Sequence, residues 1–275
     1  MASDNIGTDG VYAMVGDVNI SISGGKMGNV YGGGWAQKTN GKSIVGDVNI
    51  NIAGGTIANV FGGGSHSTSG GATTAGNVTI TVSGGTITGD IYARGQLAGD
   101  SVTSAKVVFT GAENFACGVY GYTATTGEVA SDAVLSFTDY TGTFSGNVGG
   151  FNGIRFDGDA AATFGTGATI DNGAWSFDLS EREETYSDTS LLTWSNADFV
   201  NDTVKVKFAD ATQAMEGWSI ATAAFDATTT FDLYIGSSET PAATVAYNTA
   251  IDGGAFNGWG FTSVGGTLKF AQITA

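Results

Sequence analysis

Cysteine, proline and histidine are almost absent from this sequence, which contains one of each among 275 residues. The single thiol, Cys117, excludes an intramolecular disulfide. Because His66 is the only histidine, the chain also lacks the four Cys and His ligands of a structural zinc site. Cys117 is therefore expected to be a small buried apolar side chain. The lone Pro241 and the lack of a Gly-X-Y period exclude collagen.

Positive charge is also scarce, since the chain has 10 Lys and Arg residues and 26 Asp and Glu residues, which gives a net charge of -16. Nucleic-acid and anionic-lipid surfaces both require clustered cations, and the Lys and Arg residues do not cluster. No apolar run approaches the roughly 20 residues of a transmembrane helix. The start, MASDNIGTDG, lacks the basic and apolar regions of a signal peptide, which suggests a mature or excised chain. The sequence predicts no nucleic-acid partner and no membrane insertion.

Glycine, in contrast, is abundant: it accounts for 45 of the 275 residues, whereas it makes up about 7% of an ordinary protein. Only 13% of the residues are charged while 41% are apolar, and the remainder are largely Thr, Ser, Asn and Ala. Such a mixture suits strands that have one buried face and one uncharged polar face. The surplus glycine is expected at turns and at close backbone approaches.

A glycine-punctuated unit recurs along the first hundred residues. VGDVNISISGGKMGNVYGGG at 15–34 returns as VGDVNINIAGGTIANVFGGG at 45–64, and in altered form from Ala75. The spacing is thirty residues both times. A fixed period of this length is typical of stacked repeats that bury their apolar faces against their neighbours. The sequence therefore predicts a β-solenoid with coils of about thirty residues.

Each repeat begins with a strictly alternating segment, in which Val18, Ile20 and Ile22 correspond to Val48, Ile50 and Ile52 thirty residues later. Alternation predicts a half-buried strand with the intervening Asn and Ser side chains in solvent. The glycine pair that follows predicts a corner, and a second short strand and a glycine triplet come next. The polar segments WAQKTNGKS and SHSTSGGAT are expected to be return loops. Equivalent positions should stack about 4.8 Å apart.

The pattern divides the chain into a solenoid over 1–172, regular over 15–104 and irregular over 105–172, and a C-terminal region over 173–275. Four of the five tryptophans lie in that last region. Because a solenoid end exposes unpaired strand edges and an open core, this region is expected to form an aromatic-rich β cap. At most a turn or two of helix is expected, at Ala209 to Met215. Nothing before Val11 resembles a cap, so an open first coil is expected.

The segments GDVNISISGG, GGTI, VFGGG and GWGFTSVGGTLKF resemble secreted bacterial β-helix proteins, in particular autotransporter passenger domains and related adhesins. The resemblance lies in the composition and the style of the repeats, over most of the chain. It implies a right-handed parallel β-helix, a hand that also agrees with the right-handedness of parallel crossovers. It further implies display outside the cell and a role in adhesion. The C-terminal translocating barrel of that family is not part of this sequence, so a trimmed chain or another export route is expected.

Parallel β-helices also host polysaccharide lyases and hydrolases, which use clustered carboxylates with a His or Arg. His66 is expected in a flexible loop with no orienting carboxylate near it in sequence, which disfavours a Ser-His-Asp triad. Asp157 and Asp159, with Arg155, are the best local carboxylate pair for glycoside hydrolysis. The alternative for this FDGDA segment is a solvated turn, which the Asp-Gly dipeptide favours. The sequence therefore predicts a protein that is not an enzyme.

Asp17 and Asp47 occupy one register of successive repeats, and Asn77 completes the column. Two carboxylates about 5 Å apart repel, so a cation such as Ca²⁺ between them would stabilise the pair. The alternative is that their oxygens accept backbone N–H bonds and cap turns. That alternative is favoured, and no cofactor is expected.

Tyr31, Phe61 and Tyr92 form a second column, with Trp35 nearby. Each follows a small aliphatic residue, and adjacent strand residues face opposite ways. If the aromatic rings face outward, the four residues form a ladder that could stack on sugar rings. The alternative is that the rings cover the glycine corner or fill the core.

These patterns favour a non-enzymatic extracellular or bacterial cell-surface module, adhesin-like, that makes weak multivalent contacts with a glycan or a host surface. A self-assembling fibre subunit that stacks end to end through open solenoid edges is the first alternative. A polysaccharide lyase or hydrolase on a β-helix scaffold is the second and less favoured one.

Overall fold

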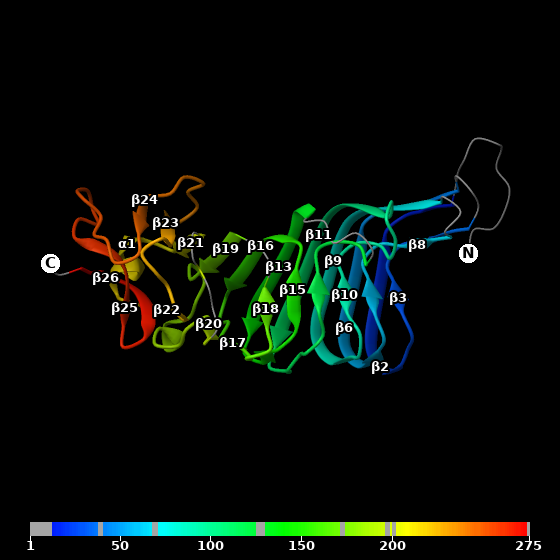
Figure 1. The fold of residues 1–275 in the computed structure, drawn as a ribbon, viewed down its shortest axis with the longest axis horizontal. Helices are drawn as coiled ribbons and strands as arrows, with labels where there is room; N and C mark the ends of the chain where they lie inside the picture. Colours follow the sequence, from blue (N-terminus) through cyan, green and yellow to red (C-terminus); the bar gives the residue numbers. More distant parts are fainter. Residues whose placement is uncertain are drawn as a thin grey trace. The chain divides into compact units, whose positions relative to one another are not determined.

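The computed structural model of the chain describes residues 13–37, 41–67, 71–124, 130–170, 174–195, 199 and 202–273. It is nearly all β, with 55% strand and 3% helix, and its stacked parallel sheets form a β-solenoid of about 7 turns (Figure 1). The predicted all-β solenoid class is thus confirmed. Two compact units interleave in sequence: Met1–Leu135, Ser145–Asn152 and Gly167–Gly173 form the first, and Ser136–Phe144, Gly153–Thr166 and Ala174–Ala275 form the second.

Long parallel strands dominate the first unit: β2 (Val18–Lys26), β6 (Val48–Ile57), β9 (Ala72–Ile87) and β11 (Ser101–Gly111). Their register repeats the thirty-residue period, since Val18 pairs with Val48 and Val48 pairs with Val78. The predicted alternation is confirmed in the second and third coils, where the inward aliphatic side chains are at most 1% exposed. These residues are Val48, Ile50, Ile52, Val78, Ile80 and Val82.

Shorter strands form the other faces of the first unit. One sheet has the order β18 (Thr169–Ile170), β15 (Asn147–Gly149), β12 (Val119–Tyr120), β10 (Ile91–Tyr92), β7 (Val60–Phe61), β3 (Val30–Tyr31). β1 (Ala13–Val15) precedes the first repeat. The return segments also hold strand residues, in β4 (Trp35–Ala36), at the start of β5 (Lys42–Val45) and in β8 (Ser65–His66), while residues 38–40 and 68–70 lie outside the described residues. The prediction of return loops was therefore wrong there, because coil stacking pairs the backbone whatever the side chains are, as in Ser65 N–H to Gly34 O at 3.0 Å.

The glycine pairs do not form the corner that was expected. They lie inside the continuous strands β2, β6 and β9, where the register shifts by a bulge. The second glycine of each pair has a positive φ, 87° at Gly25, 91° at Gly55 and 90° at Gly85. A bulge takes an extra residue into a strand, and glycine adopts the required backbone conformation without a Cβ penalty.

The second unit is built on parallel strands with an aromatic core. β16 (Phe151–Asp157), β19 (Ala174–Asp178), β21 (Thr203–Phe208) and β23 (Thr230–Ile235) pair in that order. β14 (Thr143–Phe144), β17 (Ala162–Phe164), β20 (Leu192–Trp194) and β22 (Ser219–Thr222) form a second face. Phe156 stacks between Phe137 and Phe177 at centroid distances of 5.1 and 5.3 Å. The core thus changes from aliphatic residues in the first unit to aromatic ones in the second.

Antiparallel strands end the second unit. β24 (Ala243–Ala246) pairs antiparallel with β23, and β26 (Thr267–Gln272) pairs antiparallel with both β22 and β25 (Trp259–Val264). Phe261, Leu268 and Phe270 of this cap are buried. The expected helical turn is α1 (Ala211–Met215), whose first turn is capped by the Asp210 side chain accepting from the Gln213 N–H. Both the aromatic-rich β cap and the short helix agree with the sequence prediction.

Candidate functional site

The outward face of the long sheet in the first unit carries amide and hydroxyl groups in rows. Asn19 pairs in register with Asn49, and Asn49 with Thr79; a second row contains Ser21, Asn51 and Thr81. Within the first row, the Asn49 Nδ2 donates to Asn19 Oδ1 at 3.1 Å. Neighbouring strands lie about 4.8 Å apart, so the face offers uncharged polar groups at a fixed repeat.

A stacked aromatic column runs along another face of the same unit. Tyr31 stacks on Phe61 at a centroid distance of 4.9 Å, Phe61 on Tyr92 at 5.3 Å, and Tyr92 on Tyr120 at 5.3 Å. Tyr120 extends the column beyond the three residues predicted for it, and its Val-Tyr dipeptide matches those of the earlier coils. Because Phe61 and Tyr92 each lie between two rings, and Phe61 is only 3% exposed, the faces of these two rings are covered within the column.

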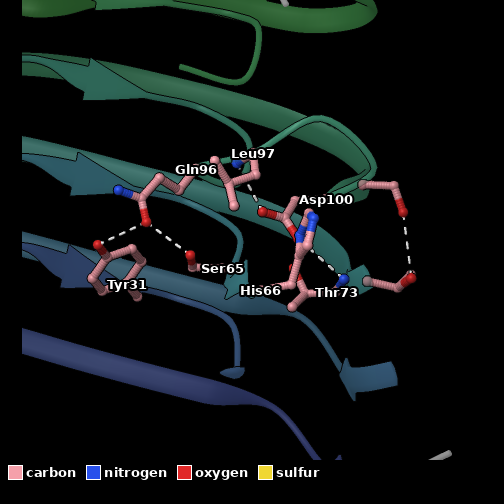
Figure 2. Close-up of polar contacts among 9 residues, drawn as sticks. Tyr31, Ser65, His66, Thr73, Gln96, Leu97 and Asp100 are labelled. Atoms are coloured by element: carbon pink, nitrogen blue, oxygen red, sulfur yellow. Dashed lines mark hydrogen bonds and ion pairs between the residues drawn. The ribbon is translucent and has the colours of Figure 1, made fainter. Parts of the chain in front are cut away.

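Trp35 lies apart from the column, on β4, where it pairs with Ser65 of β8. Its side chain is 59% exposed. Figure 2 shows Gln96 joining the column to β8: its Oε1 accepts from the Tyr31 hydroxyl at 3.1 Å and from the Ser65 hydroxyl at 2.7 Å. The ring of Tyr31 is therefore held by polar contacts as well as by stacking. The four aromatic residues do not form one continuous ladder, and glycan stacking by Tyr31 and Trp35 stays a prediction.

Asp90 adjoins this column and influences two groups. The pKa of Tyr92 is raised to about 12 by desolvation, and further by the charge of Asp90, which accepts from the Tyr92 hydroxyl at 3.3 Å. Burial likewise raises the pKa of the Cys117 thiol to about 12, with a smaller contribution from Asp90. Cys117 is buried and free, as the sequence predicted.

Because the thiolate is the reactive species, Cys117 should not react with a disulfide reagent at pH 8 while the chain is folded. One thiol per chain should be titrated once the protein is unfolded in guanidinium chloride, and this can be followed by the absorbance of released thionitrobenzoate. A stoichiometric reaction of the native protein within minutes at pH 8 would contradict the buried placement.

The column of Asp17, Asp47 and Asn77 links successive coils. Asp17 Oδ1 accepts the Asp47 backbone N–H at 2.9 Å, and Asp47 Oδ1 accepts the Asn77 backbone N–H at 2.8 Å and its Nδ2 at 3.1 Å. These are side-chain to backbone bonds of the kind that the alternative to a metal site requires. Within the described part of the chain, no group of three or more His, Cys, Asp or Glu residues is arranged to hold a metal ion. A Ca²⁺ ion between Asp17 and Asp47 stays the less favoured hypothesis.

His66 does not occupy the flexible loop that was expected. It belongs to β8 and is 8% exposed, and its Nδ1 lies 2.8 Å from Oδ1 of Asp100. The same oxygen accepts the backbone N–H and the hydroxyl of Thr73, while Oδ2 accepts the Leu97 N–H (Figure 2). The expectation failed because Asp100 is 34 residues away in sequence, in the loop of the next coil, where the strict period no longer indicates which residues meet.

This cluster has a carboxylate and an imidazole, as a hydrolytic relay does, but its neighbouring hydroxyl is engaged elsewhere. Ser65, which precedes His66, donates to Gln96, and the Thr73 hydroxyl donates to Asp100. The side chain of Asp100 is 0% exposed. A fully buried carboxylate with several donors is well suited to holding three chain segments together, which is a structural role.

The FDGDA segment forms the turn that the sequence favoured. β16 ends at Asp157, and Gly158 follows with a φ of 60°. The two carboxylates have different partners: Asp157 Oδ2 accepts from the Ser136 hydroxyl at 3.3 Å, and Asp159 Oδ1 accepts the Glu183 N–H at 3.0 Å. Arg155 is exposed on β16. The segment thus fixes chain crossings within the second unit.

Arg182, within the most charged segment of the sequence, was not singled out as a buried group. It is 5% exposed, and its guanidinium donates to the carbonyl oxygens of Gly158, Ala160 and Thr189 at 3.1, 2.7 and 2.7 Å. Burial lowers the pKa of this guanidinium. Neighbouring glutamates made the segment look solvated, and no sequence signal separates Arg182 from them.

Comparison with known proteins returned no match to any protein-family model, curated protein or solved structure. Among the described residues, no helix has the length and apolar character needed to cross a membrane.

Proposed function

We propose that this chain is a non-enzymatic binding module displayed outside the cell or on a bacterial cell surface, with an adhesin-like role. The observation that carries the proposal is the exposed polar face of β2, β6 and β9, on which Asn19, Asn49, Ser21 and Asn51 repeat in register. Uncharged amides and hydroxyls at a regular spacing suit the hydroxyl groups of a glycan or of a host-surface glycoprotein. Each contact is weak, and the repeat makes the contacts multivalent.

The test uses the chain coupled to beads, so that avidity is retained, and a printed array of neutral and acidic glycans, fibronectin and collagen. Selective retention on at least one glycan or matrix probe is expected. The double variant Asn51→Glu/Thr81→Glu should lower that retention at least tenfold, because two charges interrupt the polar rows. Thr163→Glu, an exposed residue on β17 of the second unit, is the matched control. Retention that the double variant leaves unchanged would count against this face.

An enzyme on the same scaffold is the competing function, with Asp157 as the carboxylate to test. A screen for new reducing ends and for unsaturated products on acidic and neutral polysaccharides should show no turnover. Turnover that is lost in Asp157→Asn would overturn the non-enzymatic proposal.

A further inference from the structure

The outward face of the second unit carries two cations with a small hydroxyl side chain between them. β16, β19 and β21 are consecutive strands of one sheet (Figure 1). Arg155 pairs in register with Ser176, and Ser176 pairs with Lys205. Their strand neighbours, among them Ile154 and Val204, are buried in the core, so these three side chains point outward. Because neighbouring strands lie about 4.8 Å apart, the Cα atoms of Arg155 and Lys205 are about 10 Å from each other.

The two cations are not neutralised by the chain itself. Among the residues that the structure describes, no carboxylate oxygen lies within 4.0 Å of the Arg155 guanidinium or of Lys205 Nζ. Both side chains are exposed, and Ser176 is half-buried between them. Two long cationic side chains thus flank a short hydroxyl side chain that the strand holds in place.

The carboxylates around these cations have donors of their own. Asp178 Oδ2 lies 3.0 Å from Nζ of Lys207. Asp232, the register partner of Lys205, accepts from the Thr244 hydroxyl at 2.6 Å. Because these carboxylates already have partners, the charges of Arg155 and Lys205 remain free to attract an external anion.

The three side chains suit a carboxylate. A guanidinium donates two parallel N–H bonds to the two oxygens of a carboxylate, and a Lys ammonium adds a further charge-assisted bond. The Ser176 hydroxyl can donate to the same group from the sheet surface. We propose that Arg155, Ser176 and Lys205 bind the carboxylate of a sugar acid whose neighbouring sugars are neutral. This site is separate from the polar face of the first unit and does not depend on it.

The acidic surroundings of the site select an isolated carboxylate over a densely charged polymer. Asp157 and Asp178 lie two residues further along β16 and β19, and Asp232 lies beside Lys205. A single carboxylate between the two cations is attracted, whereas further negative groups on the same ligand would approach these aspartates and be repelled. The net charge of -16 repels any polyanion in the same way. Neutral sugar hydroxyls, in contrast, can donate to the aspartate oxygens.

The first experiment follows the backbone amide resonances of the isotopically labelled full chain at low ionic strength. The chain is titrated with sialyllactose, which has one carboxylate, and with lactose, which has none. Saturable shifts at Arg155, Ser176 and Lys205 are expected with sialyllactose alone. Equal shifts with lactose, or shifts confined to other parts of the chain, would overturn the proposal.

Competition with polyanions tests the class of ligand. Heparin and polygalacturonate carry negative groups on nearly every sugar, so at equal molar charge they should displace sialyllactose poorly. Displacement by heparin at lower charge concentration than sialyllactose itself would show that the site prefers dense or sulfated polyanions, and would overturn the stated ligand.

Substitutions of the two cations test the site itself. Arg155→Gln and Lys205→Gln should each weaken sialyllactose binding at least about fivefold, because each removes a charge-assisted bond to the carboxylate. Arg155→Lys keeps the charge but loses the paired N–H groups, so its affinity should lie between those of the parent and Arg155→Gln. Lys269→Gln, on β26 of another sheet, is the matched control and should leave the affinity unchanged. An equal loss in Lys269→Gln would show that only net charge matters and would refute the site.

Asp232→Asn provides a test in the opposite direction. It removes a negative charge beside Lys205, while its amide oxygen can still accept from Thr244. Sialyllactose binding should tighten about twofold, and the gain should shrink as salt is added, because salt screens exposed charges. Unchanged or weaker binding at low salt would contradict the placement of the carboxylate. All these substitutions lie in the second unit, so loss of this site and loss of adhesion through the first unit are separate outcomes.

Discussion

Replacement of Asp100 with alanine is expected to lower the free energy of unfolding by about 4 kcal/mol, the range found when a buried charged group loses one partner. The carboxylate accepts the N–H of Thr73 and of Leu97, and it lies beside the imidazole of His66. Alanine would leave these donors buried without acceptors, at about 1–3 kcal/mol each before relaxation. Urea denaturation followed by circular dichroism measures the change.

The matched control for this effect is Asp188→Ala. Asp188 has a side chain that is 98% exposed, and its contact with Lys269 is 3.8 Å long. Removal of an exposed carboxylate should change stability by less than about 0.5 kcal/mol. Equal urea midpoints for Asp100→Ala and the parent chain would show that the cluster does not hold the coils together. Asp100→Asn, which keeps one acceptor oxygen, should fall between the two.

Gly54→Ala is expected to destabilise the chain by about 2 kcal/mol, because overpacking in a closely packed region costs this much. A Cβ at Gly54 would lie 2.6 Å from the carbonyl oxygen of Ser23, a main-chain atom of the preceding coil. Main-chain atoms cannot rotate away as a flexible side chain can, so the two coils must separate locally. Thermal and urea denaturation of the variant measure the loss.

Gly24 provides a control at the same position of the preceding coil. A Cβ at Gly24 would meet nothing within 4 Å. Its replacement by alanine should be neutral, or stabilise by up to about 1 kcal/mol through the unfolded chain. If Gly24→Ala and Gly54→Ala were equally destabilising, close stacking of the coils would not be the cause.

The sequence predicts the fold of the first unit well because the alternation of apolar residues and the thirty-residue period point to the same buried positions. Alternation identifies the inward residues of β6 and β9, and the thirty-residue offset identifies which of them pair, as for Val48 and Val78. The aromatic column follows from the same offset. Its stacked geometry, however, depends on how the rings turn, and a ring-face contact between Tyr31 and Phe61 cannot be inferred from spacing alone.

The cluster around His66 could not be predicted because it is formed by a loop that departs from the repeat. Asp100 and Gln96 belong to a segment without an equivalent in the first two coils, and they reach back to β8 and β3. The burial of Arg182 could not be predicted for a different reason. Its partners are main-chain carbonyl oxygens, which every residue has, so no side-chain pattern in the sequence identifies them. The alternation of apolar residues also does not show whether a glycine pair forms a corner or a bulge within a strand.

The equal register of the first three coils also bears on how such a chain can vary in length. Removal of residues 45–74 would bring Val18 to face Val78, a residue with the same role as Val48, and would bring Tyr31 to face Tyr92 in place of Phe61. The paired strands of one coil can thus substitute for those of the next, but Asp100 would then lie beside Ala36 and Ser43, the register partners of His66 and Thr73, and would lose the imidazole. A single inserted residue in β6 has no such freedom, because it would turn every later side chain of that strand to the opposite face.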